Sequence, residues 1–177
     1  MRIITGKYKG RHFDIPRTFK ARPTTDFAKE NIFNVLTGYT DFDGASALDL
    51  FAGTGSITLE LLSRGCNSVV SVELDRDHHR FIQQCINKLG DVENVQCLRA
   101  DAFRFIKGCH RQFNFIFADP PYALKELPHI PDLIFQHSLL AKDGVFVFEH
   151  GKDNDFSGHP RFVEHRSYGS VNFTLFR

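Results

Sequence analysis

The chain has 177 residues, of which 42% are hydrophobic and 24% are charged, and these values are typical of one globular domain with a substantial core. No apolar stretch approaches the roughly 18 residues of a membrane-spanning helix. The N-terminus is charged from Arg2 onward, so we expect no secretory signal and a cytoplasmic protein. The histidines and cysteines show no spacing typical of a metal site, and we predict none.

Positive charge is concentrated at the N-terminus, although the whole chain carries only +1. Residues 1–30 contain eight Lys or Arg against three Asp or Glu, a net +5 that leaves −4 for the rest of the chain. A basic segment on an acidic body fits a polyanionic partner such as nucleic acid. It fits a solvated surface hairpin equally well, and charge alone does not choose between the two.

The N-terminal part begins with residues 2–15, where two short β-prone runs flank a middle with Gly and Lys and predict a basic hairpin. A polar connector, residues 16–23, follows. Thr24-Thr25-Asp26 is a typical helix start, and we expect a helix that ends near Gly38. Its apolar residues, with Phe27 among them, fall roughly on one side and predict the buried face of the helix.

The remainder of the chain alternates short apolar strands with helices, and we treat residues 41–177 as the main domain with residues 1–40 as an extension. We expect strands at 47–51, 68–74, 95–98, 113–118, 145–149, 162–165 and 171–176. We expect helices at 57–64, 76–89 and 133–140, and a short helix that ends at residue 106. This alternation predicts an α/β fold with a doubly wound, mostly parallel sheet of seven strands, preceded by the N-terminal hairpin and helix.

The stretch from Phe113 to Tyr122 reads FNFIFADPPY, an apolar run that ends on a carboxylate, two prolines and a tyrosine. The run suits a strand buried on both faces of a parallel sheet. Because Pro120 and Pro121 have no N–H to donate, the strand must end there. Asp119 is thereby fixed at the carboxyl end of a strand, where ligands bind in open α/β sheets. Acceptors beside an aromatic ring suit a flat group with N–H donors; a plain proline turn is the alternative.

A second chemical signal follows the other predicted strands. Residues 52–56, Ala-Gly-Thr-Gly-Ser, come directly after the first strand, and such glycines let the backbone approach a ligand at a helix N-terminus. Glu73 closes the next strand, where a carboxylate can accept both hydroxyls of a ribose. A dinucleotide fingerprint requires a third glycine at the position of Thr58. Its absence weakens the case for NAD or FAD as the ligand. With Asp101 after the third strand, the pattern predicts a nucleoside site, and a tight turn beside a solvated acid is the alternative.

These motifs, in this order, carry a resemblance to a known family. LDLFAGTG at 48–55, Val72-Glu73, Asp101 and DPPY at 119–122 resemble the motifs of class I S-adenosylmethionine-dependent methyltransferases, and DPPY marks those that methylate exocyclic amino groups. RIITGKYKGR at 2–11 and RPTTD at 22–26 narrow the resemblance to the RsmD family of bacterial 16S ribosomal RNA guanine methyltransferases. The match runs from residue 2 to at least residue 149.

The resemblance implies a Rossmann-like methyltransferase sheet, S-adenosylmethionine as cofactor, and methylation of the exocyclic 2-amino group of a guanine in 16S ribosomal RNA, free or in the assembled small subunit. It implies cofactor contacts by Asp49, Phe51, Gly53, Gly55, Glu73, Asp101 and Ala102, and catalysis by Asp119, Pro120 and Tyr122. The basic segment and its neighbours supply the candidate RNA contacts, which are Lys7, Lys9, Arg11, Arg22 and Thr24, with Pro121 beside the base.

The expected mechanism follows from the poor nucleophilicity of an aromatic amine. Hydrogen bonds from its N–H groups to the Asp119 carboxylate and the Pro120 carbonyl would localise the nitrogen lone pair and aim it at the methyl group. Tyr122 would stack on a base that is unpaired or flipped out. Alternatives are adenine amino methylation in RNA or DNA, glutamine methylation in protein, a non-catalytic nucleoside-binding partner subunit, and a nicotinamide-dependent oxidoreductase. We expect a monomer.

Overall fold

The computed structural model describes residues 1–20 and 23–177, which form one sheet flanked by helices. The strands are β1 (Ser46–Leu50), β2 (Ser68–Glu73), β3 (Val95–Arg99), β4 (Phe113–Ala118), β5 (Leu140–His150), β6 (Phe162–Tyr168) and β7 (Val171–Phe176). The helices are α1 (Asp26–Leu36), α2 (Ser56–Ser63), α3 (Arg76–Leu89), α4 (Ala102–Gly108) and α5 (Ile130–Gln136), with a short 3-10 helix, η1 (Leu127–His129), before α5.

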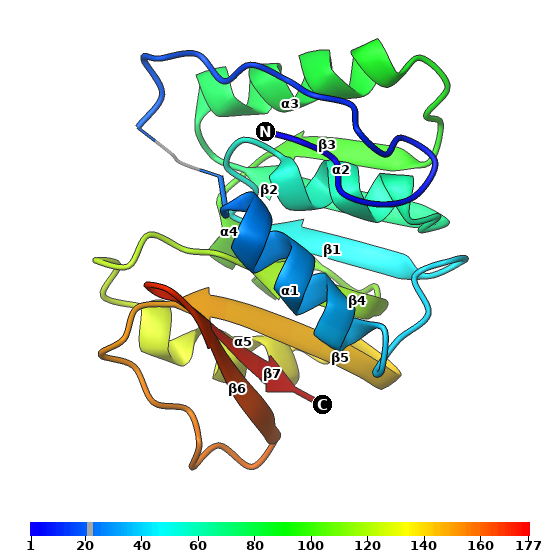
Figure 1. Cartoon of the computed structure of the whole chain (residues 1–177). Helices are drawn as coiled ribbons and strands as arrows, with labels where there is room; N and C mark the ends of the chain where they lie inside the picture. The colour runs from blue at the N-terminus through cyan, green and yellow to red at the C-terminus, as the bar shows by residue number, and fades with distance from the viewer. Residues whose placement is uncertain (21–22) are drawn as a thin grey trace.

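The seven strands lie in the order β3-β2-β1-β4-β5-β7-β6 (Figure 1). Strands β1 to β5 are parallel, and β7 runs antiparallel to both of its neighbours, β5 and β6. The predicted doubly wound, mostly parallel α/β fold with seven strands is confirmed.

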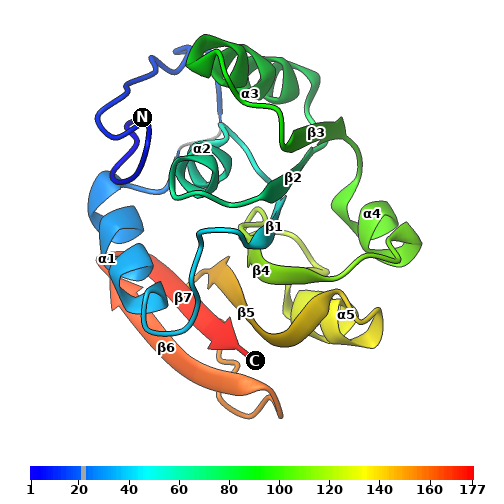
Figure 2. The same ribbon diagram turned by 90° about the vertical axis from the view of Figure 1, so that its right-hand side faces the viewer.

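Helices cover both faces of the sheet. Helices α1, α2 and α3 lie on one face, and α4 and α5 lie on the other (Figure 2). Each face has its own apolar core: Ala47 and Phe115 contribute to the first, and Leu48 and Ile116, their neighbours along β1 and β4, contribute to the second. Because both faces are buried, the central strands read as continuous apolar runs rather than as alternating ones.

The register of the sheet aligns the carboxyl ends of its central strands. Leu50 on β1 pairs with Val72 on β2 and with Ala118 on β4, and Ala118 pairs with Phe148 on β5. The residues that follow these four therefore lie along one edge of the sheet: Phe51, Glu73, Asp119 and Glu149.

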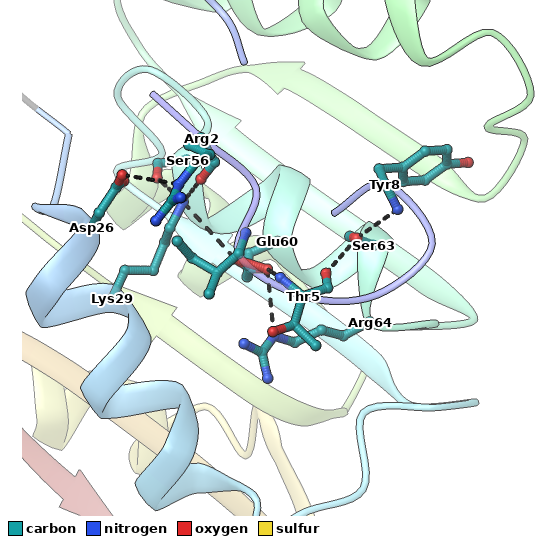
Figure 3. A network of polar contacts seen from close by, with 10 residues as sticks. Arg2, Thr5, Tyr8, Asp26, Lys29, Ser56, Glu60, Ser63 and Arg64 are labelled. Atoms are coloured by element: carbon teal, nitrogen blue, oxygen red, sulfur yellow. Dashed lines mark hydrogen bonds and ion pairs between the residues drawn. The ribbon is translucent and has the colours of Figure 1, made fainter. Parts of the chain in front are cut away.

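A buried polar network attaches the N-terminal segment to α2 (Figure 3). Glu60 on α2 accepts hydrogen bonds from the backbone N–H groups of Ile4, at 2.8 Å, and Thr5, at 3.2 Å. Its carboxylate also lies 3.9 Å from Lys29 Nζ and 3.5 Å from Arg64 Nε. All three charged side chains are at least nine-tenths buried, so the network is part of the interior of the protein.

Lys29 extends this network to the start of α2. Its ammonium group donates to Ser56 Oγ at 3.0 Å and to the carbonyl of Arg2 at 2.5 Å. Burial is the main cause that lowers the Lys29 pKa, against the opposing effect of the Glu60 charge. Since Ser56 is the first residue of α2, the network fixes the helix directly after the glycine loop at 52–55.

Several local predictions differ from the structure. The predicted N-terminal hairpin is a loop closed by one isolated bridge, Arg2 to His12, because its middle bonds to α2 instead, with Lys7 N donating to Ser63 O at 2.8 Å. Phe27, predicted on the buried side of its helix, is 64% exposed, and its ring edge contacts Tyr168. The buried side of α1 is formed by residues further along the helix.

The predicted helix at 133–140 is wrong at both ends. Helix α5 begins at Ile130 and ends at Gln136. Ser138 has a φ of +54°, and the N–H of Leu139 donates to Ile134 O, which closes the helix. Leu140 then pairs with Phe113 and belongs to β5.

The N-terminal 40 residues share one core with the rest of the chain, since Ile3 and Phe33 belong to the same apolar cluster as Phe115. The division of the chain at residue 40 stays a prediction. Among the helices of the described residues, none is both long and apolar enough to cross a membrane.

Candidate active site

A cavity of about 990 Å³ opens at the carboxyl ends of β1, β2, β4 and β5. Its volume is in the range of small-molecule and cofactor sites. The walls come from the loop after β1, the residues that follow β2, β3 and β4, the end of β5, and the segment that precedes α1.

Most of the predicted site residues line this cavity. They are Thr24, Asp49, Phe51, Gly53, Glu73, Asp101, Ala102, Asp119, Pro120, Pro121 and Tyr122. Gly55 serves the backbone instead: its φ is +82°, and a Cβ there would lie 2.9 Å from Ile82 Cγ1 on α3. Arg22 lies outside the described residues.

The loop after β1 has an unusual backbone. Phe51 and Gly53 both have positive φ angles, +57° and +58°, and a non-glycine residue in this region is strained. Between them and α2, the Thr54 hydroxyl is buried and has no hydrogen-bond partner among the described residues. Buried hydroxyls are normally bonded, so this one is free to bond a water or a ligand held by the loop.

Glu73 attaches this loop to β2. Its carboxylate accepts hydrogen bonds from the N–H groups of Gly53 and Asp75, each at 2.7 Å. Each carboxylate oxygen has a second lone pair, so the side chain can still accept from a ligand hydroxyl in the cavity. The ribose contact of Glu73 stays a prediction, and the loop contact is a role that the sequence did not indicate.

Asp49 lies beneath the loop and is almost completely buried. It accepts a hydrogen bond from Thr58 Oγ1 at 2.6 Å. Burial raises the pKa of Asp49 to about 7, the Thr58 bonds oppose the rise, and the charges of Glu73 and Glu149 add to it. Thr58 therefore stands in place of the third glycine of a dinucleotide fingerprint because its hydroxyl binds Asp49.

Asp101 and Ala102 border the cavity at the start of α4. The Asp101 carboxylate caps this helix by accepting from the N–H of Arg104 at 3.0 Å. Next to it, the rings of Phe103 and Phe51 meet edge to face at 5.9 Å, which connects α4 to the loop after β1. The adenine contact expected of Asp101 and Ala102 stays a prediction.

The DPPY motif forms the turn predicted for it. The N–H of Asp119 donates to Leu50 O at 3.3 Å, and β4 ends at Ala118. Pro120 is buried, whereas the ring of Tyr122 is 46% exposed at the cavity. The structure thus brings the predicted catalytic turn and the predicted nucleoside loop to one cavity.

Sequence reasoning missed Glu149, which is 5% exposed near the end of β5. Its carboxylate accepts hydrogen bonds from Thr24 Oγ1 at 2.9 Å and from the Tyr122 hydroxyl at 3.2 Å. Its carboxyl and that of Asp119 also influence each other's pKa. Glu73 and Asp119 were predicted because each is an acidic residue at the end of an apolar strand. Glu149 has the same position on its strand, so the same signal could have identified it.

The carboxyl groups of Asp119 and Glu149 both have raised pKa values, and burial is the main cause at each. It holds the pKa of Asp119 well above its usual range, and the charges of Glu149 and Asp49 add to the rise. Burial also raises the pKa of Glu149, against the hydroxyl bonds from Thr24 and Tyr122. No Lys or Arg of the described chain is among the groups that shift these two pKa values.

The basic residues Lys7, Lys9 and Arg11 lie elsewhere. Lys7 forms an exposed ion pair with Asp91, and Arg11 Nη2 donates to the carbonyl of Lys88 at 2.7 Å. Both partners lie at or beyond the C-terminal end of α3, beside the amino ends of the strands (Figure 1). The structure therefore does not bring these basic residues together with the cavity, and their RNA contacts stay a prediction.

The cavity combines acceptors for N–H and O–H groups with an aromatic ring and several carboxyls. Such a set suits a nucleoside that carries a positive charge, because carboxyls with no cationic neighbour among the described residues favour a cation. S-Adenosylmethionine has these features, with ribose hydroxyls, an adenine amino group and a sulfonium. The residues present fit this cofactor.

The strand order, the glycine loop and the DPPY turn at one cavity define a Rossmann-like methyltransferase. The family described as conserved hypothetical protein 95 matches residues 1–177, the whole chain. The chain belongs to this family, and the predicted RsmD membership is confirmed by the relatives that follow.

Two relatives match along the entire chain. YlbH of Bacillus subtilis strain 168 is 36% identical, over 100% of this chain and 98% of that protein. Ribosomal RNA small subunit methyltransferase D of Escherichia coli K12 is 31% identical, over 100% of this chain and 89% of that protein.

Solved structures share the fold. That of yhhF from Escherichia coli has a TM-score of 0.85 and 27% identity, and covers 99% of this chain and 96% of its own. A more distant structure, the Thermus thermophilus 16S rRNA N2 G1207 methyltransferase RsmC in complex with AdoMet and guanosine, has a TM-score of 0.70 and 18% identity. It covers 90% of this chain and 44% of its own, and it supports the fold alone.

Proposed function

We propose that this protein transfers a methyl group from S-adenosylmethionine to the exocyclic 2-amino group of a guanine in 16S ribosomal RNA. The observation that carries the proposal is the meeting of the DPPY turn and the glycine loop at one cavity. The name of the Escherichia coli relative supports ribosomal RNA as the substrate, and such a substrate implies a cytoplasmic protein. DPPY supports an amino group as the acceptor.

In this proposal the glycine loop, Asp49 and Glu73 hold the methyl donor, and Asp101 with Ala102 meets its adenine. When bound, the cofactor supplies an electrophilic methyl group on a cationic sulfur. Thr54, whose buried hydroxyl has no partner among the described residues, donates to the cofactor or accepts from it. The strained backbone at Phe51 allows the loop to approach the ligand closely.

The DPPY turn holds the acceptor base. The Asp119 carboxylate and the Pro120 carbonyl accept the two N–H bonds of the amine, which localises the nitrogen lone pair and directs it along the line of displacement. The half-exposed ring of Tyr122 stacks on the base, with its hydroxyl held by Glu149. Proton loss from nitrogen comes after the new N–C bond has formed, because only then is the nitrogen acidic.

The test is methyl transfer from labelled S-adenosylmethionine to three acceptors: free 16S RNA, small subunits from a strain that lacks the modification, and duplex DNA. The labelled nucleoside is then identified. Label in 2-methylaminoguanine from RNA or subunits supports the proposal and shows which form is the substrate. Label in methyladenine would assign another acceptor to the same turn. Tight cofactor binding without transfer to any acceptor would favour a non-catalytic nucleoside-binding subunit.

A further inference from the structure

Asp119 and Glu149 form a carboxyl pair. Recognition of the amine needs Asp119 alone, so it does not explain why a second acid lies beside it. The two carboxyls line one cavity and act on each other, and a buried carboxyl beside a second, partly buried one favours a state with one proton between them unless a cation is near. Such a pair holds one proton between two acids. The register explains the contact, because Ala118 and Phe148 pair in the sheet directly before the two acids.

The described groups that act on this carboxyl pair are negative or neutral. Asp49 faces it from β1, and the Tyr122 hydroxyl faces it from the DPPY turn. Thr24, from the segment before α1, supplies a hydroxyl donor. Lys20 and His78 line other parts of the cavity wall and do not act on either carboxyl. Among the described residues no cation shifts the pKa of either carboxyl, so a bound ligand with a positive charge can supply the charge that allows the pair to lose its proton.

We propose that the Asp119–Glu149 pair responds to the charge of the cofactor: it holds one proton in the free protein, releases that proton when S-adenosylmethionine binds, and regains one from the methylated amine. The inference rests on the proposed function, which directs the amine held by Asp119 at the sulfonium methyl. A cation at that position favours the ionised form of both acids. S-Adenosylhomocysteine has a neutral sulfur and leaves the pair with its proton.

The charges and atoms of the step balance. The nitrogen lone pair forms the N–C bond while the C–S bond breaks, and its electron pair stays on sulfur, which becomes neutral. The methylated nitrogen then gives a proton to the Asp119 carboxylate. The pair again holds one proton beside a neutral sulfur, and the net proton of the reaction is the one released when the cofactor bound. Asp119 touches the reacting amine, and Glu149 is a positioning residue that acts through Asp119.

The test measures protons released on binding rather than turnover. The full chain is titrated with S-adenosylmethionine and with S-adenosylhomocysteine by calorimetry at one pH near 7, in two buffers of different protonation enthalpy. Both ligands carry the same amino acid group, so its ionisation cancels in the difference. We expect S-adenosylmethionine to release up to one proton more per site. The affinity ratio of the two ligands should rise with pH by up to about tenfold per unit.

Glu149→Gln keeps the shape and an acceptor for the Tyr122 hydroxyl but removes the shared proton, and it should abolish the difference in proton release. Asp119→Asn should do the same and serves as the second variant if the first fails to fold, which thermal unfolding checks. Glu126→Gln, an exposed acid outside the cavity, should keep the full difference.

Equal proton release by the two ligands in the unmodified protein would overturn the inference. So would a difference that persists in both Glu149→Gln and Asp119→Asn. Failure of the proposed function has other signatures: either neither ligand binds the unmodified protein, or both bind and the methyl-transfer assay finds no label in 2-methylaminoguanine.

Discussion

Two clusters of charged side chains that are largely removed from water meet at α2, one through Glu60 and the other through the bond of Asp49 to Thr58, and they differ in the signs that they combine. The mixed cluster consists of Lys29, Glu60 and Arg64, and the carboxyl cluster consists of Asp49, Asp119 and Glu149. In the mixed cluster the acid lies between two bases, 3.9 Å from Lys29 Nζ and 3.5 Å from Arg64 Nε. In the carboxyl cluster the nearest charges have the same sign.

The difference separates structural charge from functional charge. Opposite charges compensate each other's loss of hydration inside the folded chain, so the mixed cluster is complete without a ligand. Like charges cannot, and they shift their pKa values instead. Burial of charge alone therefore does not mark an active site in this protein. The marker is burial without an opposite charge among the described residues.

The largest effect is expected from Asp119→Ala. The variant removes the acceptor for the amine in the transition state and should lower turnover by about 10²–10³-fold. Binding of S-adenosylhomocysteine should persist, because the bond from Gly53 to Glu73 that attaches the glycine loop does not involve this side chain. Methyl transfer and S-adenosylhomocysteine affinity are measured on the same preparation. Turnover like that of the unmodified protein would contradict the role given to Asp119.

Glu60→Gln tests whether the mixed cluster stabilises the fold. The change leaves the Lys29 ammonium and the Arg64 guanidinium without a counter-charge in the interior, and we expect a loss of about 3–5 kcal/mol in unfolding free energy. Urea denaturation measures it. Asp77→Asn is the matched control, because its ion pair with Arg76 is exposed and should contribute little. A Glu60 variant as stable as the control would show that the mixed cluster is not structural.

The two clusters also show how far the sequence predicts this site. Asp119 and Glu73 were identified because each ends an apolar strand, a signal that is local in the chain. The contact of Asp119 with Glu149 was missed because it depends on β5 lying beside β4, which is a property of the topology. Glu60 was missed for a related reason, since its partner Lys29 lies in the segment that the sequence presents as a basic arm.

The same limit explains the other differences. The strands β1, β2 and β4 were predicted within one or two residues because apolar runs with glycine or proline at their ends are local signals. The end of α5 was not predicted correctly. It depends on a positive φ at Ser138, and the sequence gives no sign of this because the residue is not a glycine. The basic loop was predicted as free charge, and its ion pair from Lys7 to Asp91 joins residues far apart in sequence.

Asp49→Asn should stabilise the free protein, in contrast to Glu60→Gln. The Asp49 pKa is raised from 3.8 to about 7, so the unfolded chain loses this proton at a lower pH than the folded one. The folded protein therefore loses stability relative to the variant as pH rises from about 4 to 7, by at most about 4 kcal/mol. Below pH 4 the two should differ little.

Denaturation of both proteins at pH 4, 5.5 and 7 measures this trend. A variant that loses stability relative to the unmodified protein over the same range would contradict it. The variant should also bind S-adenosylmethionine more weakly, which separates the contribution of Asp49 to function from its cost in stability.

The smallest effect is expected at the basic loop, where Lys7, Lys9 and Arg11 are charge-reversed together. The Lys7–Asp91 ion pair is exposed, and exposed pairs contribute little, so Lys7 can exchange its partner for an RNA phosphate. For every phosphate that the loop no longer binds, the slope of log affinity for RNA against log salt should fall by about 1. Cofactor affinity should stay unchanged, because the loop lies at the amino edge of the sheet.

Lys9→Ala alone leaves the bonds of Lys7 and Arg11 intact, and it tests whether a single side chain accounts for one step in the salt slope. Binding of 16S RNA is measured over a series of salt concentrations for this variant, the triple variant and the unmodified protein. An unchanged slope in the triple variant would show that the basic residues of this loop attach it to α3 and do not bind RNA. The RNA would then be held by the edge of the sheet where the carboxyl cluster lies.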